Sequence, residues 1–392
     1  MNRKLIASSV ISILGLSAPL EAQELTWHGF ASQGIVQSSN SEFITNNDSV
    51  TAQLTELGVN TRLQLSSKVG VVGQAVYLNG GNRFEEGGRL DYLFVDWKLP
   101  ELWGWNSSLN IGRFKNRHWL YSSTRDVPQT RPMAVLPQSV YSDSLRDVII
   151  GSDGIDLRVF KYNNYGTWEV NWSYGSSPIS QATTRALVAP DARGDAEQDF
   201  VHQASVFWQP DLLNWRVGFS YLDSDFRYDP APDERYVQGS SSIQRYMFSL
   251  SYFSSKWEIN SEIFREKQVN NGGLFDGFTS DRTAEGGYIH ARYIVNPTTS
   301  LIAGVDTFDR DRSDRNGRRF EQLTMGLQPA FSGYMDSFML GGRWDFDSNW
   351  RIQGEHQWVR GTARLNLLGT GEAIIDANEY WQMWSIQVMH WF

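Results

Sequence analysis

The sequence predicts an all-β protein: a transmembrane antiparallel β-barrel of about sixteen strands. Apolar and polar residues alternate with a period of two over segments of about 9 to 13 residues, the length of a tilted strand that crosses a bilayer. Long polar stretches alternate with short turns along the chain. The chain opens with the pattern of a secretory leader and closes on an alternating strand whose last residue is Phe392.

Composition excludes several other classes of protein. The chain has 392 residues, of which 14% are aromatic, which argues against disorder. No run of about 18 apolar residues exists, so a bundle of transmembrane helices is excluded. The net charge of -9 argues against binding nucleic acid through a basic face, and we expect no nucleic-acid partner. Without cysteine there is no disulfide, no thiolate zinc site and no cysteine nucleophile.

The first 22 residues have the organisation of a signal peptide. Arg3 and Lys4 precede an apolar stretch from Leu5 to Leu16, and Ala22 offers a small residue for cleavage. A short membrane anchor is the alternative, but the apolar stretch is too short to span about 30 Å of hydrocarbon. We therefore predict a signal peptide at 1–22 and one barrel domain at 23–392.

The connections between the alternating segments support the barrel. Trp215, Phe219 and Tyr221 on one face alternate with Arg216 and Ser220 on the other, as in the remaining segments. Sixteen such segments leave seven short turns and eight long loops, at roughly 38–52, 79–89, 114–150, 176–197, 224–242, 268–283, 309–336 and 362–379. A secreted β-sandwich would not need tryptophan at strand ends, where this chain has Trp97, Trp103, Trp105, Trp208, Trp215, Trp257, Trp344, Trp350 and Trp358.

The last strand carries a specific signal. Trp384, Ile386, Val388 and Phe392 share one face of an alternating segment. A terminal phenylalanine on such a strand resembles the β-signal of outer-membrane proteins, which implies the barrel-assembly machinery as a partner. His390 departs from that pattern, because an apolar residue is usual at its position.

A second resemblance covers about 60 residues. It rests on the segments Gly112-Arg113-Phe114-Lys115-Asn116, Thr124-Arg125-Asp126-Val127-Pro128, Thr130-Arg131-Pro132 and Leu136-Pro137-Gln138-Ser139-Val140-Tyr141, and on Trp27-His28-Gly29-Phe30 in the first strand. These residues resemble porin-like outer-membrane proteins of Gram-negative bacteria, and more distantly sixteen-stranded diffusion and anion-selective porins. The resemblance implies an outer-membrane location, a homotrimer and a third long extracellular loop, 114–150, that folds inward. It carries over no catalytic or ligand-binding residues.

The composition of loop 114–150 fits a constriction. Pro128, Pro132 and Pro137 break any ladder and stiffen the chain, so we expect neither strand nor helix there. The charged residues predicted to form the constriction are mostly cationic: Arg113, Lys115, Arg117, Arg125, Asp126, Arg131, Asp143 and Arg146. One hypothesis is a weak anion preference at this point, because rings of charge set ion preference in a pore. The other hypothesis is that these charges pair and pin the loop to the wall.

Further arginines are assigned to the wall of the lumen. An arginine that faces lipid at mid-depth costs about 2–4 kcal/mol, so arginines within strands are expected to face inward. They are Arg62, Arg158, Arg216, Arg245, Arg292, Arg343 and Arg351. Lumen carboxylates are expected at Glu56, Asp156, Glu169, Glu258, Glu262, Asp306 and Glu355.

The function expected from this pattern is passive diffusion of small hydrophilic solutes or anions through a porin. A barrel plugged by its loops that serves as an adhesin or structural protein is one alternative, and an enzyme at the barrel rim is another. No cofactor is expected: the six histidines are scattered, and the charged run that begins at Asp309 has Asp314 where a calcium loop needs glycine. Loop arginines could contact phosphates of lipopolysaccharide in the surrounding outer membrane.

Overall fold

The computed structural model describes residues 24–392 except 144–145, 190, 211–213 and 366–377. The predicted signal peptide, 1–22, lies outside the described residues. In the described part of the chain, none of the helices has both the length and the apolar character required to cross a bilayer.

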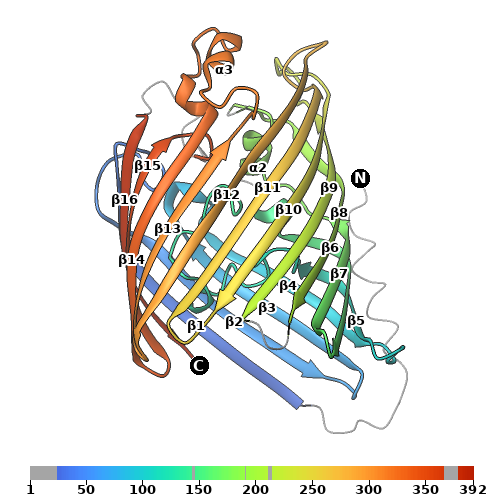
Figure 1. Ribbon diagram of the computed structural model, residues 1–392. Helices are drawn as coiled ribbons and strands as arrows, with labels where there is room; N and C mark the ends of the chain where they lie inside the picture. The colour runs from blue at the N-terminus through green and yellow to red at the C-terminus, as the bar shows by residue number, and fades with distance from the viewer. Residues whose placement is uncertain (1–23, 144–145, 190, 211–213, 366–377) are drawn as a thin grey trace.

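Sixteen described strands form one closed antiparallel barrel, as predicted (Figure 1). Each strand pairs with its neighbours in sequence, and β1 pairs with β16 to close the ring. The strands are β1 Glu24–Ser39, β2 Thr51–Gln64, β3 Val69–Asn79, β4 Gly87–Lys98, β5 Asn106–Lys115, β6 Gly151–Asn163, β7 Gly166–Ser176, β8 Asp195–Gln209, β9 Trp215–Asp229, β10 Gly239–Phe253, β11 Trp257–Gly272, β12 Thr279–Asn296, β13 Thr299–Asp309, β14 Tyr334–Asp347, β15 Trp350–Gly361 and β16 Tyr380–Trp391.

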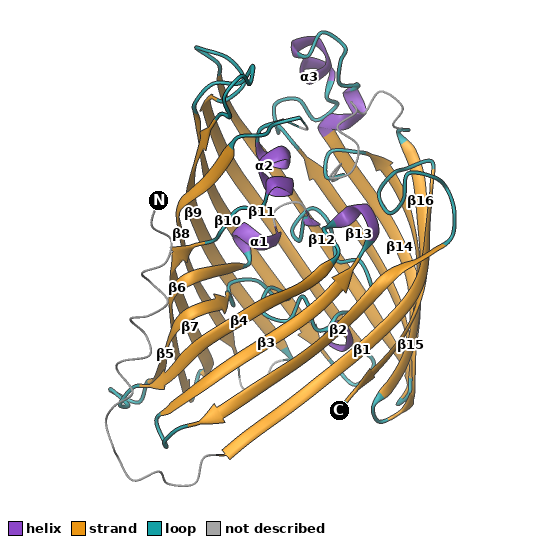
Figure 2. Ribbon diagram, turned by 180° about the vertical axis from the view of Figure 1, so that it is seen from behind, coloured by secondary structure: helices purple, strands orange, loops and turns teal. Residues whose placement is uncertain are grey.

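Short turns gather at one end of the barrel and longer loops at the other. In Figure 1 the turns and the C-terminus lie at the bottom, and the loops lie at the top. We call these the turn side and the loop side. The loops carry the described helices α1 Arg146–Ile149, α2 Gln181–Leu187 and α3 Arg318–Leu323, of which α3 stands beyond the loop-side rim (Figure 2).

The third long loop differs from the prediction in two details. It spans 116–150, because β5 continues to Lys115 and β6 begins at Gly151. The expectation that it contains no helix is wrong, because a 3-10 turn forms at Pro128–Thr130 and α1 forms just before β6. Pro128 occupies the first position of the 3-10 turn, where its fixed φ and its missing N–H are tolerated.

The outer face of the barrel is apolar. On β9, Trp215 and Phe219 are 40% and 49% exposed, whereas Gly218 and Ser220 on the other face are buried. The same alternation exposes Val59, Phe248, Ile289 and Leu340 on other strands. A band of exposed apolar side chains around a closed barrel is the surface that lipid tails cover.

The C-terminal residue seals the seam between the first and last strands. Phe392 and Gly29 exchange both backbone hydrogen bonds, at 3.1 and 3.0 Å. The ring of Phe392 lies over Gly29 so closely that a Cβ there would be 2.4 Å from the ring Cζ. Trp27 packs edge-on against the same ring at 5.4 Å. The terminal phenylalanine is therefore a structural part of barrel closure.

Candidate functional site

Loop 116–150, which connects β5 to β6, hydrogen-bonds to carboxylates on strands that lie far from these two around the barrel. Each of these bonds runs from a backbone N–H of the loop to a buried side chain on the inward face of a strand. The pairs are Leu120 with Glu262 on β11 at 3.0 Å, Ala134 with Glu355 on β15 at 2.9 Å, and Ser139 with Asp306 on β13 at 3.2 Å. A buried carboxylate needs several donors, and the loop backbone supplies some of them.

Glu262 is the most heavily bonded of these acceptors. It is fully buried and accepts hydrogen bonds from the hydroxyls of Tyr141, Tyr288 and Ser249 as well as from the backbone of Leu120. Hydrogen bonds to a charged acceptor are about twice as strong as neutral ones. Glu262 therefore ties the start and the end of the loop to one point on β11.

His118 fixes the beginning of the loop to the wall. Its Nδ1 and Nε2 each lie 2.9 Å from a serine hydroxyl, that of Ser205 on β8 and that of Ser173 on β7. Burial, reinforced by the nearby charges of His202 and Arg117, lowers the pKa of His118 to about 3. The imidazole is therefore neutral at pH 7.

Apolar side chains of the loop pack against an apolar part of the inner wall. Large side chains of the loop and of seven consecutive strands, β8 to β14, form one buried cluster. Its members include Trp119, Tyr121, Met133, Leu136, Val140, Tyr141 and Val148 of the loop, and Val201, Leu222, Phe226, Ile243, Met247, Phe264, Tyr288, Ile302, Phe308 and Met339 of the wall. The inner wall of a wide aqueous pore is polar. On this side of the barrel the inner wall is instead apolar and packs against the loop. The sequence analysis did not predict this apolar packing.

Each charged residue predicted for the constriction forms an ion pair with a residue of opposite charge. The pairs are Arg113 with Asp153, Lys115 with Asp91 and Asp126, Arg117 with Asp156, Arg125 with Asp143, Arg131 with Glu56 and Arg146 with Asp126. Arg83, which the sequence analysis missed, also pairs with Asp143 at 2.8 Å. This arrangement favours the hypothesis that the charges pin the loop to the wall.

Two acidic residues of the loop stay ionised through their partners. Burial opposes the charged form of Asp126, but Arg146 and Lys115 outweigh it and hold the pKa of Asp126 well below its usual range. Burial acts on Asp143 in the same way, and Arg83 and Arg125 lower its pKa. The ion pairs therefore persist at neutral pH.

Arg113 lies on the outward face of β5. It shares the face of Ile111, which is 47% exposed, whereas Phe114 on the opposite face is buried. It bonds to Asp153 of β6 at 2.7 Å on this face. Arg113 nevertheless lines one hollow together with Lys115, Arg125, Asp126, Asp143 and Arg146.

The seven arginines assigned to the wall all alternate with outward-facing apolar residues and lie on the inward face. Their carboxylate partners are Asp96 for Arg62, Glu169 for Arg158 and Arg216, Glu266 for Arg245, Glu258 for Arg292, and Asp345 for Arg343 and Arg351. Two carboxylates thus each serve two arginines. All except Arg245 lie in the turn-side half of their strands, and Arg62 and Arg158 are more than a third exposed.

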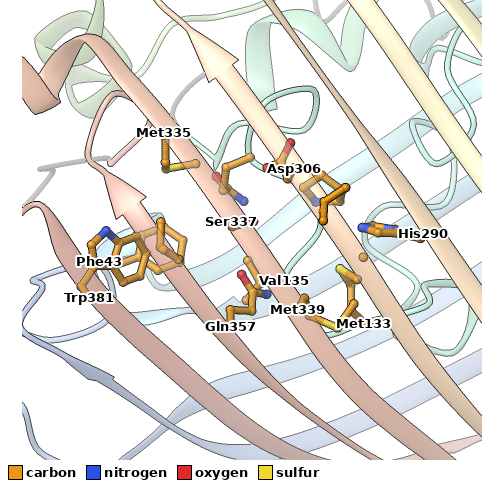
Figure 3. Close-up of a pocket in the computed structure, with 15 residues that line it drawn as sticks. Phe43, Met133, Val135, His290, Asp306, Met335, Ser337, Met339, Gln357 and Trp381 are labelled. Carbon is orange, nitrogen blue, oxygen red and sulfur yellow. The ribbon is translucent and has the colours of Figure 1, made fainter. Parts of the chain in front are cut away.

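A small cavity separates the loop from the inner face of β12 to β16 (Figure 3). Met133 and Val135 of the loop face Phe43, Met339 and Trp381 across it. Its volume is about 20 Å³, enough for about one water molecule. His290 Nδ1 and Asp306 Oδ1 lie beside it, and neither atom has a hydrogen-bond partner among the described residues.

The ladder between β4 and β5 stops short of the loop side. Its last pair is Leu93 with Arg113, so residues 87–92 of β4 have no partner on β5 in the described ladders. A hollow of about 320 Å³ lies here, lined by Asp91, Lys115 and Asp126 among other residues. The charged pairs at this end of the loop therefore border an interruption in the wall.

Comparison with known proteins matches only solved structures. No protein-family model and no curated protein sequence matches the chain. The anion-selective porin from Comamonas acidovorans is similar with a TM-score of 0.59 and 10% identity over 95% of this chain and 100% of that one. The outer-membrane channel DcaP of Acinetobacter baumannii has a TM-score of 0.57 at 10% identity, covering 95% of this chain and 98% of its own.

OmpF of Salmonella typhi gives the same result, with a TM-score of 0.57 and 11% identity over 94% of this chain and 98% of that one. The fold is that of the outer-membrane porins. Structural similarity at identities this low establishes only the architecture, a closed barrel of sixteen described strands. The identity of the solute has to be inferred from the chemistry of this chain's own residues.

Proposed function

We propose that this protein is an outer-membrane channel for the passive diffusion of small hydrophilic solutes, with loop 116–150 folded into the barrel as its constriction. The observation that carries the proposal is the set of bonds from the loop to Glu262, Asp306 and Glu355 on β11, β13 and β15. The loop leaves β5 and returns to β6, so it has to cross the lumen to reach these strands. A barrel of sixteen strands is wide enough to keep an aqueous passage beside such a loop.

We place the passage on the side of β2, β6 and β9 rather than on the side that holds the loop. The loop bonds to Glu355 on β15 and packs against β1, β15 and β16 through a second buried apolar cluster. The inward side chains of Arg62, Arg158 and Arg216 instead remain 37%, 39% and 30% exposed. Exposed charged side chains on the inner wall support a hydrated path on this side of the lumen.

Solute entry into liposomes tests the channel. Vesicles that contain the refolded mature chain are expected to swell in arabinose and to swell more slowly in larger sugars, because the loop narrows the lumen. Absence of swelling with arabinose, from protein that is folded by heat-modifiable migration, would contradict the proposal.

A weak anion preference is the finer part of the proposal. Since the loop charges are paired, the preference would come from the turn-side arginines that share a carboxylate, Arg158 with Arg216 and Arg343 with Arg351. Only charges within about 8 Å of a passing ion act on it at physiological salt. Their partial exposure to the lumen supports this origin.

The plugged barrel is the second candidate, and the apolar cluster of the loop and wall favours it. Deletion of 118–145 separates the two. If the loop narrows a channel, the parent protein passes small sugars and the deletion variant also passes larger ones. If the loop plugs the barrel, the parent protein passes no sugar and only the deletion variant does. Deletion of 311–332, the loop that carries α3 beyond the rim, is the matched control and is expected to change neither result.

We propose a non-enzymatic role. In the described residues no group of three or more His, Asp or Glu is placed to hold a metal ion. His118 and His290, the most deeply buried histidines, face the loop and the wall rather than the rim. Replacement of each of the other four histidines in turn by asparagine, with conductance and hydrolysis of ester substrates measured together, would reveal a rim enzyme as lost turnover at unchanged conductance.

We also propose that the barrel associates as a homotrimer after assembly by the barrel-assembly machinery, in contact with lipopolysaccharide. The similar OmpT of Vibrio cholerae is known in a trimer form, at 9% identity and a TM-score of 0.56. The interruption between β4 and β5 leaves unpaired backbone that a neighbouring subunit could cover. Light scattering of the detergent-solubilised protein, corrected for bound detergent, distinguishes one copy from three.

A further inference from the structure

Four arginines lie close together at the loop side of the barrel, and three of them act on one carboxylate, Glu266. Arg245 of β10 bonds through Nε to Glu266 of β11 at 2.8 Å. Arg282 of β12, Arg310 at the start of loop 310–333 and Arg364 in segment 362–365 complete the group. We call these four residues the arginine cluster. They come from four separate parts of the chain, so no local sequence pattern brings them together.

Aromatic rings hold the guanidinium groups of the cluster in place. Arg364 lies over Phe308 with its Cζ 3.8 Å from the ring centroid. Arg245 lies over Phe264 at 4.7 Å, and the rings of Phe264 and Phe308 stack at 6.3 Å. Arg310 lies over Phe320 at 4.4 Å. Contact with a ring face fixes the plane of a guanidinium and leaves the N–H groups at its edge free to bind.

Several of these N–H groups have no partner. Arg245 Nη1, Arg310 Nε and Arg364 Nε are buried and donate no hydrogen bond to any described residue. Arg282 donates to the side-chain oxygen of Gln268, which carries no charge. Buried donors left unpaired are costly, and arginine does not escape the cost by losing its proton.

The cluster has more positive than negative charge. Glu266 is its one direct carboxylate partner among the described residues. Asp306 lies near Arg364, and Asp311 lies near Arg282, but they accept hydrogen bonds from Ser139 and Ser313. Burial, with the charges of Arg282 and Arg364, lowers the pKa of Arg310 to about 9. The guanidinium is still charged at pH 7, so the four arginines outnumber the carboxylates near them among the described residues.

We propose that the arginine cluster is a binding site for a small solute that carries phosphate groups, held at the loop-side mouth of the barrel. Guanidinium forks match pairs of phosphate oxygens, and two or more converging forks select multiply charged anions over chloride. Arg245 lies on the inward face of β10, which favours a solute in the lumen over a lipid at the outer face. Binding at this site does not require that the barrel conducts.

Calorimetric titration of the folded mature protein in detergent with inorganic pyrophosphate tests the proposal. Saturable binding of one pyrophosphate is expected at pH 7.5. The variant R310Q/R364Q alters only loop residues, and it should weaken binding at least about tenfold, because two of the four charges are removed. The variant R318Q/R319Q is the matched control: it removes two exposed arginines of the neighbouring α3 and should bind as the parent does. Heat-modifiable migration verifies that each variant is folded.

Two results would overturn the inference. One is the absence of saturable binding by the parent protein. The other is equal weakening in both double variants, which would mean that only the general charge of the loops attracts the anion. Repeating the titration in vesicles with and without lipopolysaccharide separates the two sources of phosphate. Unchanged affinity supports a solute site, and a large loss of affinity would assign the cluster to lipid phosphates instead.

Discussion

Tyr141 in the third long loop donates its hydroxyl hydrogen to Glu262 on β11, and both side chains are fully buried. The same hydroxyl accepts a hydrogen bond from the backbone N–H of Tyr121 at 2.8 Å. One phenol thus links two parts of the loop to the barrel wall. Most of the order of loop 116–150 is expected to depend on contacts of this kind.

Tyr141→Phe is therefore expected to loosen the loop. The change leaves the N–H of Tyr121 without its acceptor and removes one donor from Glu262, at a cost of about 1–3 kcal/mol. Hydrogen exchange of the backbone amides in 116–150 should become about ten times faster or more. Tyr165→Phe, in a turn where the side chain is 76% exposed, is the control and should leave exchange unchanged. Equal exchange in both variants would show that the apolar cluster alone holds the loop.

Docking of the loop should weaken as the pH falls below about 6.5. The pKa of His118 is about 3 in the folded protein, so between these values the released loop binds a proton that the docked loop does not. Docking then loses about 1.4 kcal/mol for each pH unit until about pH 3. Asp126 and Asp143, whose pKa values are lowered, stay ionised from pH 7.5 to 5.5 and contribute nothing to the change.

His118→Asn isolates this effect. Asparagine can still bond to a serine hydroxyl but does not titrate, so the variant should lose less loop protection between pH 7.5 and 5.5 than the parent does, after correction for intrinsic exchange. The parent protein and the exposed control His28→Asn should both lose protection at pH 5.5. A pH dependence that survives in His118→Asn would point to another titrating group.

Ion selectivity should respond to Glu169. Arg158 and Arg216 share this carboxylate, so Glu169→Gln leaves two lumen arginines without their counter-charge. The ratio of chloride to potassium permeability is expected to rise about twofold. The reversal potential in a KCl gradient measures it, with Glu101→Gln in an exposed turn as the control. An unchanged reversal potential would place the selective region away from the turn side.

Phe392→Ala should impair assembly of the barrel. The ring covers Gly29 and contacts Trp27 at the closing seam, and its removal loses about 2 kcal/mol of apolar contact. The heat-modifiable fraction in outer membranes should fall. Phe346→Ala removes another outward aromatic ring on β14 and is the control. Equal yields of the two variants would mean that the terminal ring has no special role in assembly.

The barrel was predictable from sequence because its determinants are local. Period-two alternation such as that of Trp215 to Tyr221 follows from one face in lipid and one face inward, and turns break it at regular intervals. The strand count, the order of long and short connections and the inward side of Arg216 all follow from this pattern.

The contents of the lumen were less accessible to sequence reasoning. Inward residues such as Phe264 and Met247 alternate correctly, but the pattern does not say whether water or a loop covers them. The pairing of Arg83 with Asp143 joins residues 60 positions apart, and the arginine cluster joins residues from four separate segments of the chain. Contacts of this range depend on the three-dimensional path of the loops. The start of the loop was misplaced for a different reason, because β5 ends two residues later than expected, at Lys115.

Single-channel recording of the refolded mature protein in a planar bilayer tests the central claim most directly. Steady, ohmic steps are expected, because a passage along β2, β6 and β9 remains open beside a firmly held loop. Deletion of 118–145 should then enlarge each step. Silence from correctly folded parent protein, with conductance only after the deletion, would contradict the channel and establish a barrel that its third loop plugs.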